Sequence, residues 1–409
     1  MVSAGIKMNF NKRTLILAMA LASTQTYAAE NFSDAFKQGQ LKGQIKSYSF
    51  DEDYDSNDDA DNNIWANGGY VSYKTERFKG LSFGTTFQTS HVTSIDDPAD
   101  KFKKTMNARG SVMSESYLSF QFGNTNFKGG RQYLSLPLIK GSGSRLIKES
   151  FEAYEITNTD LPKTLISFAK VNKYQTRTDK VTKNTNAATF YNDDVQRGDV
   201  GGFYDIGTDG ALSFYLKNNS IENLNLQAHY VDFIDEVKDV YIDATYRFET
   251  KFKPFIAAQY YGSNYDESAR EDSKLLGYKA GVSIDGYNLH AAYTTVDDEG
   301  SVIRGIGEAA TASFTNSSQT SGNYHAGTDS WQIGISKKYN NLKVKLSHTD
   351  SDNPISKYQL KQTYAEIGYK LSGAFQGCST SIRYTIYDFG TDADAKDKDE
   401  IRAKFFYSF

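Results

Sequence analysis

The sequence predicts one domain of the all-β class, a transmembrane antiparallel β-barrel with short turns at one end and long loops at the other. First, segments of about ten residues with alternating apolar and polar side chains recur from position 41 onward. Second, 29 Tyr and 26 Phe accompany only 5 Pro, and aromatic residues favour strands whereas proline removes a sheet hydrogen bond. Third, the mean hydropathy of -0.58 is too low for membrane helices, each of which needs roughly 20 apolar residues.

Residues 1–28 are expected to be a secretory signal peptide. Lys12 and Arg13 precede a short apolar run at 14–22, and small residues follow up to Ala28. A basic start, a short apolar segment and an A-x-A-like site are typical of such a signal rather than of a membrane span. Residues 29–409 would then form the single barrel domain. Cleavage would change the net charge from -4 to about -7, which argues against a nucleic-acid-binding surface.

The last nine residues contain the clearest strand. Apolar side chains at Ile401, Ala403, Phe405, Tyr407 and Phe409 alternate with polar ones at Arg402, Lys404 and Ser408. Because successive side chains of a strand point to opposite faces, one face would meet lipid and the other an aqueous lumen. A chain that ends on Phe after such an alternation resembles the closing strand of an outer-membrane β-barrel.

Short and long connections alternate along the chain. The long ones cover about 51–63, 91–112, 134–150, 174–209, 262–274, 297–328, 350–360 and 389–399. In outer-membrane barrels short turns face the periplasm and long loops face the outside. Nineteen strand-like segments can be counted, an odd number that would leave the chain ends on opposite sides. Assigning 198–207 to the fourth loop leaves 18 strands, a size at which the interior is a water-filled channel.

One stretch resembles a known family. Residues 129–139 read GGRQYLSLPLI, and residues 144–154 read SRLIKESFEAY. This resembles the OprD family of outer-membrane porins, in which a strand ending in G-(K/R)-Q precedes a proline-containing third loop and an S-R-L-(L/V)-P-x-(S/T)-F segment. Lys148 stands where the family usually has proline. The resemblance implies an 18-stranded, substrate-selective diffusion channel in the bacterial outer membrane, with the third loop folded into the pore.

The strand faces assigned to the lumen are strongly basic. Their cations are Lys42, Lys46, Lys170, Lys217, Arg247, Lys279, Lys338, Lys343, Lys345, Lys370, Arg383, Arg402 and Lys404, and the acids assigned there are Asp243 and Glu366. A charge on the lipid face would cost about 2–4 kcal/mol near the midplane, so these side chains are expected inside. Like charges in a water-filled channel concentrate solutes of the opposite sign. The resemblance implies the same guidance of substrate carboxylates along one wall.

We therefore predict a substrate-binding path that combines a basic row with a constriction. The row comprises Lys42, Lys46, Lys338, Lys343, Lys345, Lys370, Arg383, Arg402 and Lys404. Arg145 and Lys148 of the third loop would lie at the constriction, with Arg131 below them at a strand end. The alternative interpretations are that the lysines only solvate the lumen and that Arg145 only anchors the loop.

The predicted function is passive diffusion of small hydrophilic solutes, favouring anionic or carboxylate-bearing ones, without a cofactor. A general porin with little preference is one alternative, an adhesin or receptor barrel with a closed lumen is another, and a secreted β-sandwich is a third. Outer-membrane lipid and lipopolysaccharide are expected partners, and the barrel would be a monomer or a homotrimer.

Neither catalysis nor metal binding is expected. The five histidines lack metal-ligand spacing, and no G-x-S-x-G motif occurs. The alternative is a barrel hydrolase, which would need a Ser–His pair brought together by the fold. The acids Asp51, Asp53 and Asp55 have calcium-like spacing but lack the glycine and terminal glutamate of a calcium-binding loop.

Overall fold

A computed structural model describes residues 29–55, 62–95, 110–177, 202–266, 270–317, 321–390 and 397–409. The signal peptide predicted for residues 1–28 lies outside the described residues. The strands are β1 (Gln40–Tyr54), β2 (Asn62–Lys74), β3 (Leu81–Ile95), β4 (Gly110–Phe122), β5 (Thr125–Gln132), β6 (Ser150–Asn158), β7 (Thr164–Gln175), β8 (Phe203–Asp205), β9 (Ala211–Asn218), β10 (Leu224–Phe233), β11 (Val237–Arg247), β12 (Phe255–Tyr265), β13 (Ser273–Ile284), β14 (Tyr287–Val296), β15 (Asp329–Tyr339), β16 (Leu342–Asn353), β17 (Tyr358–Lys370), β18 (Cys378–Asp388) and β19 (Lys398–Ser408).

The short helices are α2 (Phe32–Lys37), η3 (Ser321–Tyr324) and η4 (Gly373–Phe375). None of the helices within the described ranges is long and apolar enough to cross a membrane.

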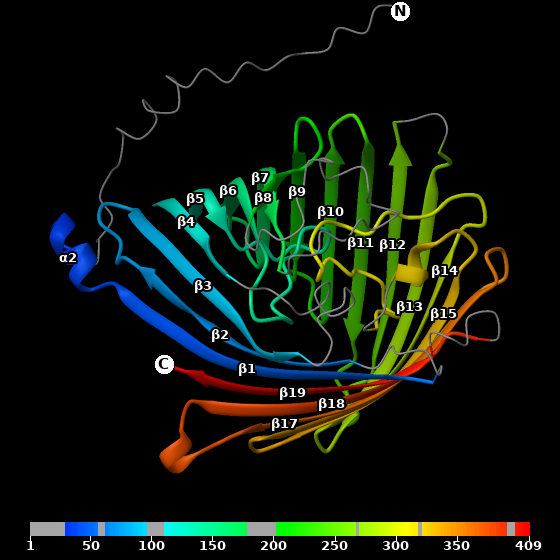
Figure 1. Cartoon of the computed structure of the whole chain (residues 1–409). Coiled ribbons are helices and arrows are strands. Elements are labelled where there is room, and N and C mark those ends of the chain that lie inside the picture. The colour runs from blue at the N-terminus through cyan, green and yellow to red at the C-terminus, as the bar shows by residue number, and fades with distance from the viewer. Residues whose placement is uncertain are drawn as a thin grey trace, which may run out of the picture.

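The sheet closes on itself because β1 pairs with both β2 and β19 (Figure 1). Every pairing between neighbouring strands is antiparallel. β9 pairs with β7 and β10, so β8 is not part of the closed wall. β8 instead pairs with the last residues of β7 at three positions, from Lys173↔Asp205 to Gln175↔Phe203. The prediction of 18 barrel strands, with the segment around 203 placed in the fourth loop, is therefore confirmed.

Side chains alternate between the two faces of the wall. On β19, Ile401 and Phe405 are exposed on the outward face, whereas Arg402 between them is buried on the inward face. Both tryptophans, Trp65 and Trp331, are exposed on the outward face, where aromatic side chains suit the membrane interface. The period-two pattern of the sequence thus separates a lipid-facing surface from a lumenal one.

The turns at the end of the barrel that carries α2 and Phe409 are tight. Between β13 and β14 only Asp285 (φ 49°) and Gly286 (φ 82°) separate the paired residues Ile284 and Tyr287. Positive φ at both central positions matches the twist of a two-residue hairpin, and Asp-Gly tolerates this conformation. We take this end as the periplasmic one, because short turns face the periplasm in outer-membrane barrels.

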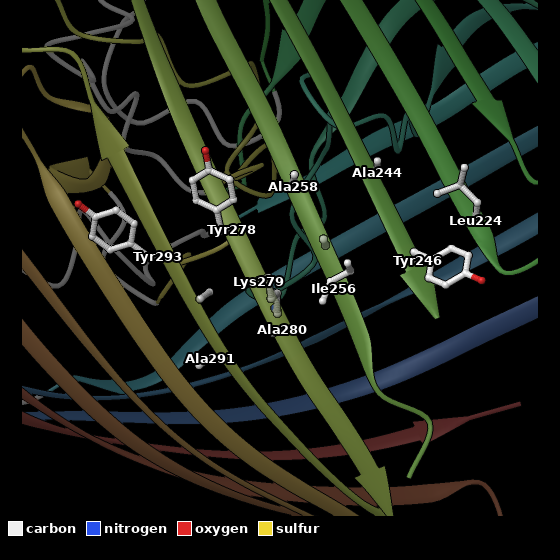
Figure 2. A pocket seen from close by; sticks show the side chains of 12 residues that line it. Leu224, Ala244, Tyr246, Ile256, Ala258, Tyr278, Lys279, Ala280, Ala291 and Tyr293 are labelled. Atoms are coloured by element: carbon white, nitrogen blue, oxygen red, sulfur yellow. The ribbon is translucent and has the colours of Figure 1, made fainter. Parts of the chain in front are cut away.

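A shallow groove of about 620 Å³ crosses the outward face of β11–β14. Ala244, Ala258, Ala280 and Ala291 form its floor, and Tyr246, Tyr278 and Tyr293 stand around it (Figure 2). The groove results from small side chains between large ones on the lipid-facing surface. It lies on the opposite side of the wall from the lumen and is not part of the solute path.

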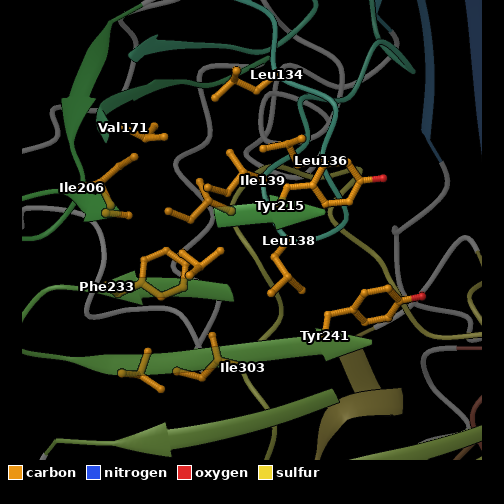
Figure 3. Packing of buried hydrophobic residues seen from close by; sticks show 14 of the residues in the cluster. Leu134, Leu136, Leu138, Ile139, Val171, Ile206, Tyr215, Phe233, Tyr241 and Ile303 are labelled. Carbon is orange, nitrogen blue, oxygen red and sulfur yellow. The ribbon is translucent and has the colours of Figure 1, made fainter. Parts of the chain in front are cut away.

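The largest hydrophobic cluster lies inside the barrel. It joins inward side chains of β7, β9, β10 and β11 to two connections, loop 3 (133–149) and loop 7 (297–328). Figure 3 shows Leu136, Leu138 and Ile139 of loop 3 beside Tyr215, Phe233 and Tyr241 of the wall. Burial of these apolar side chains holds both loops within the lumen.

Candidate functional site

Loop 3 is fixed to the wall at β3 and β1. The side-chain amide of Gln88 accepts from the Lys148 N–H and donates to the Lys148 carbonyl, both at 2.9 Å. Lys46 Nζ donates to the Leu146 carbonyl at 3.0 Å. The Leu146 side chain packs into an apolar cluster with Phe50 and Val92. This end of the loop therefore lies against the inner wall at β1–β3, beside cations of β1 such as Lys46.

The opposite end of loop 3 is fixed to β10 by His229. The Leu138 N–H donates to His229 Nδ1 at 3.0 Å, and His229 Nε2 lies 2.8 Å from Ser213 Oγ. Because Nδ1 accepts, the imidazole is neutral and its proton is assigned to Nε2, which donates to Ser213. A histidine in this state does not accept the serine proton. The fold thus brings a Ser–His pair together, but this pair anchors the loop.

Loop 7 is fixed by a buried carboxylate. Ser263 Oγ accepts from the Ile303 N–H at 2.9 Å, and the Tyr261 hydroxyl contacts the Ile303 carbonyl. Both hydroxyls donate to Asp239, at 2.7 Å from Ser263 and 3.2 Å from Tyr261. Loops 3 and 7 then pair with each other, because Ile306 N donates to the Leu138 carbonyl at 2.9 Å and Lys140 N to the Ile306 carbonyl at 3.0 Å.

An ionic clasp formed by Arg177, Glu149 and Glu308 joins loops 3 and 7 to the start of loop 4. Arg177 lies 3.7 Å from Glu149 Oε1 and 3.2 Å from Glu308 Oε2, and it donates to Ser144 Oγ at 2.6 Å. Glu149 is fully buried and accepts from the backbone N–H groups of Ser142 (2.6 Å) and Glu308 (2.9 Å). One arginine therefore holds both carboxylates.

The clasp is expected to weaken as the pH rises. Burial raises the pKa of Glu149 to about 7, and Glu308 adds to this effect while Arg177 opposes it. When the loops separate, Glu149 returns to water and to an ordinary pKa of 4.5. Closed loops therefore keep a proton that separated loops release. By linkage the closed state loses roughly 3 kcal/mol between these two pKa values.

Single-channel recording across this pH window tests the prediction. We expect more frequent excursions to high conductance at the alkaline end. Glu149→Gln should show few excursions to high conductance at every pH, because its amide keeps the oxygen acceptor and cannot ionise. Equal pH dependence in the wild type and in Glu149→Gln would contradict this role of Glu149.

The wall opposite the apolar cluster presents the basic row. All nine strand residues of the row face inward: Lys42, Lys46, Lys338, Lys343, Lys345, Lys370, Arg383, Arg402 and Lys404. Three further predicted cations, Lys217, Arg247 and Lys279, also face inward and lie on separate strands.

Register brings part of this row into direct contact. Arg402 pairs with Arg383, Arg383 with Glu366, and Glu366 with Lys345 across four adjacent strands. Glu366 accepts from Arg383 at 2.7 and 2.9 Å. Lys338 and Lys343 pair with each other close to the periplasmic end. The cations of this part of the row therefore occupy adjacent strands, and Glu366 partly neutralises Arg383.

At the predicted constriction, five side chains gather in what we call the constriction cluster: Arg145, Arg402, Lys404, Tyr48 and Phe50. The guanidinium groups of Arg402 and Arg145 lie 4.5 and 5.7 Å from the centre of the Phe50 ring. Lys404 Nζ lies 4.8 Å from the Tyr48 ring centre. Burial and the Arg402 charge lower the pKa of Arg145 to about 10, so Arg145 stays cationic at neutral pH.

One acid partly balances this cluster. Glu400 accepts from Arg402 at 2.7 Å. The charges of Arg402, Arg145 and Lys404 all act on the Tyr48 hydroxyl. Tyr48 is only 2% exposed, and its hydroxyl has no hydrogen-bond partner among the described residues. The cluster carries a net positive charge and a free hydrogen-bond donor.

Two predicted positions are wrong. Arg131 pairs with Ser116 and Glu152. Ser116 lies two residues from the exposed Leu118 on β4, so Arg131 faces outward as well. Its guanidinium lies 3.8 Å from Glu152 and 4.1 Å from the Phe203 ring centre, so it stabilises the outward side of a strand end instead of the constriction. Lys170 also faces outward, where it pairs with Leu212. Its long side chain reaches the Asp209 carbonyl beyond the strand, so its charge avoids the hydrocarbon.

Several lumenal charges were missed. The inward face also carries Lys74, Lys128, Lys398, Glu52, Glu115, Glu155, Asp239 and Glu400. Glu400 could have been found, because it alternates with Arg402 and Lys404. It was missed because the predicted strand began only at Ile401, whereas β19 starts at Lys398. Glu52 was assigned to the first loop, whereas β1 extends to Tyr54. The lumen therefore holds more acids than the two predicted.

The aspartates at 51, 53 and 55 do not form a calcium site. Asp51 and Asp53 lie in β1, and Asn63 donates to Asp51 at 2.9 Å. An extended strand keeps such side chains apart, so they do not converge on one ion. In the described ranges, no group of three or more His, Cys, Asp or Glu side chains could hold a metal.

Comparisons with known proteins agree with this architecture. A family model described as outer membrane porin, OprD family, matches residues 113–409. Curated protein sequences contain no significant match. Acinetobacter baumannii OccAB1 is a similar solved structure, with a TM-score of 0.77, 14% identity and coverage of 95% of this chain and 99% of that chain.

Two further structures show the same likeness. Acinetobacter baumannii OccAB4 has a TM-score of 0.77 at 14% identity, covering 91% of this chain and 98% of that chain. Pseudomonas aeruginosa OpdK with vanillate has a TM-score of 0.74 at 12% identity, covering 91% of this chain and 99% of that chain. At these identities the likeness shows the fold alone.

Proposed function

The chain belongs to the OprD family of outer membrane porins, and from this premise we propose that it passes small hydrophilic solutes with a preference for carboxylate-bearing anions. The family and the fold are those of channels of the bacterial outer membrane. The preference for carboxylates rests on the side chains of the lumen.

The observation that carries this proposal is the constriction cluster. Three cations from two different segments, Arg145 on loop 3 and Arg402 and Lys404 on β19, face one acid, Glu400. Guanidinium groups bind carboxylates through two parallel hydrogen bonds. A carboxylate would therefore meet several donors where loop 3 approaches the wall.

The remaining row supports transfer along the wall. Arg383, Lys345 and Lys343 continue from the cluster toward the periplasmic end. An anion that leaves Arg402 would find the next cation on a neighbouring strand, about 5 Å away. OpdK, which shares this fold, was crystallised with vanillate, and vanillate is a carboxylate.

Reversal potentials in a potassium chloride gradient test the proposal. We expect chloride to permeate better than potassium, and we expect higher salt to weaken this preference by screening. A carboxylate solute should block the current more strongly than its uncharged amide of equal size. Cation selectivity, or equal block by acid and amide, would reject the preference and leave a general porin.

A closed adhesin or receptor barrel would give no conductance at all. The same bilayer experiment therefore separates that alternative from both porin hypotheses.

A further inference from the structure

An exposed aromatic cluster lies at the periplasmic end of the barrel. Phe32 and Phe36 of α2 pack edge to face with ring centres 5.2 Å apart, and Phe78 of the β2–β3 turn lies 6.3 Å from Phe32. Phe32 is 64% exposed and Phe36 is 43% exposed. Two exposed phenyl rings clustered with a third, partly exposed one are unfavourable in water, and such patches mark interaction surfaces.

The helix that carries the cluster is fixed to the barrel. The Asn31 side chain caps it by accepting from Asp34 N at 2.9 Å. Glu76 N donates to the Ala35 carbonyl at 2.9 Å, and the Tyr73 hydroxyl contacts the Phe36 carbonyl. Ala35 is buried against the barrel end. The rings are therefore presented by an anchored helix.

The cluster continues the lipid-facing surface. Tyr73 lies on the outward face of β2, where it pairs with Leu41 of β1. Leu41 and Leu81, both exposed, are outward residues at the same end of the wall. Figure 1 shows α2 beside the ends of β1, β2 and β3, at the same side of the molecule as the C-terminus. The phenyl rings thus extend an apolar surface that already meets lipid.

Exposed cations stand beside the rings. Lys79 Nζ lies 5.5 Å from the Phe78 ring centre, and the Lys37 side chain is 74% exposed, 3.9 Å from Asp34. Aromatic rings with neighbouring lysines suit the lipid headgroup region, because the rings enter the acyl boundary while the ammonium groups stay at the phosphates.

We propose that α2 and Phe78 form an interfacial anchor that inserts Phe32 and Phe36 into the phospholipid of the periplasmic leaflet. This proposal depends on the outer-membrane location of the barrel and not on its solute preference. The anchor would fix the height of β1–β3, the strands on which loop 3 rests.

Spin labelling in vesicles of phosphatidylethanolamine and phosphatidylglycerol tests the anchor. Phe36→Cys and, separately, Lys37→Cys are made in a Cys378→Ser background and labelled with a nitroxide. The label at position 36 should collide severalfold more often with oxygen than with a water-soluble nickel chelate, approaching a control label at lipid-facing Ile45. The label at position 37 should show the opposite ratio.

Three outcomes would overturn the proposal. The first is equal accessibility of positions 36 and 37 to the nickel chelate, which means that the rings face water. The second is dipolar broadening at position 36 that disappears on dilution with unlabelled protein, which means that a second copy covers the cluster. The third applies if cysteine at position 36 disturbs the helix: the same label at Phe32 would then have to show water exposure.

Discussion

Replacing Arg145 and Lys404 together by glutamate is expected to convert the channel from anion to cation selectivity. The substitutions turn two positive charges into two negative ones where Arg145 approaches the wall. Unit charges 4 Å apart interact by about 1 kcal/mol in water and by about 4 kcal/mol near a protein surface. Since about 1.4 kcal/mol is a factor of ten, the ratio of chloride to potassium permeability should fall by roughly tenfold or more.

The matched control changes the same number of charges elsewhere on the wall. Lys338 and Lys343 pair with each other near the periplasmic end, and both are exposed. Their replacement by glutamate should shift the reversal potential only slightly, because open water screens these positions. Equal shifts from both double variants would mean that charge anywhere in the lumen sets selectivity and that the constriction cluster has no special role.

Arg177→Met is expected to release the clasp and raise the conductance. The substitution leaves Glu149 and Glu308 close together, with Arg304 lying 3.3 Å from Glu308. Removing one partner of a buried ion pair costs about 3–5 kcal/mol, because the remaining charge is uncompensated. The loops can avoid this cost by moving apart into water. Larger solutes should then enter liposomes faster, as measured by swelling rates.

Two companion variants separate release of the clasp from general damage. Lys173→Met breaks a more exposed pair with Asp205 at 3.3 Å and should leave conductance unchanged, because exposed pairs contribute only about 0–1 kcal/mol. Adding Glu149→Gln and Glu308→Gln to Arg177→Met should restore low conductance, since no buried charge remains unpaired. Wild-type conductance in Arg177→Met alone would show that the apolar contacts of Leu138 and Ile306 suffice to hold the loops.

Much of the fold could be predicted because a strand of a membrane barrel repeats one local rule. In each pair of neighbours, such as Lys343 and Val344 or Arg402 and Ala403, the first side chain faces water in the lumen and the second faces hydrocarbon. The same rule placed nine of the row residues inward. It failed at Lys170, whose outward side chain reaches the Asp209 carbonyl. Arg131, expected below the constriction, instead contacts Glu152 near the end of β5.

The candidate site could be predicted only in part. Arg145 was recognised from a motif, and Arg402 and Lys404 from alternation, but nothing in the sequence indicates that they converge on Tyr48 and Phe50. Gln88, His229, Asp239 and Arg177 were not expected to hold loops 3 and 7. Each acts on a residue at least 22 positions away in the chain, and no local pattern encodes such contacts.

The alternating faces, the number of barrel strands and the sign of the lumenal row could be predicted from the sequence, because they follow from the solvent that each side chain must meet. Which cations are neutralised by acids, and how loops 3 and 7 pair across the lumen, emerged only in the folded molecule. Charge pairing and loop burial depend on distances between residues far apart in the chain, and those distances are set when the wall closes.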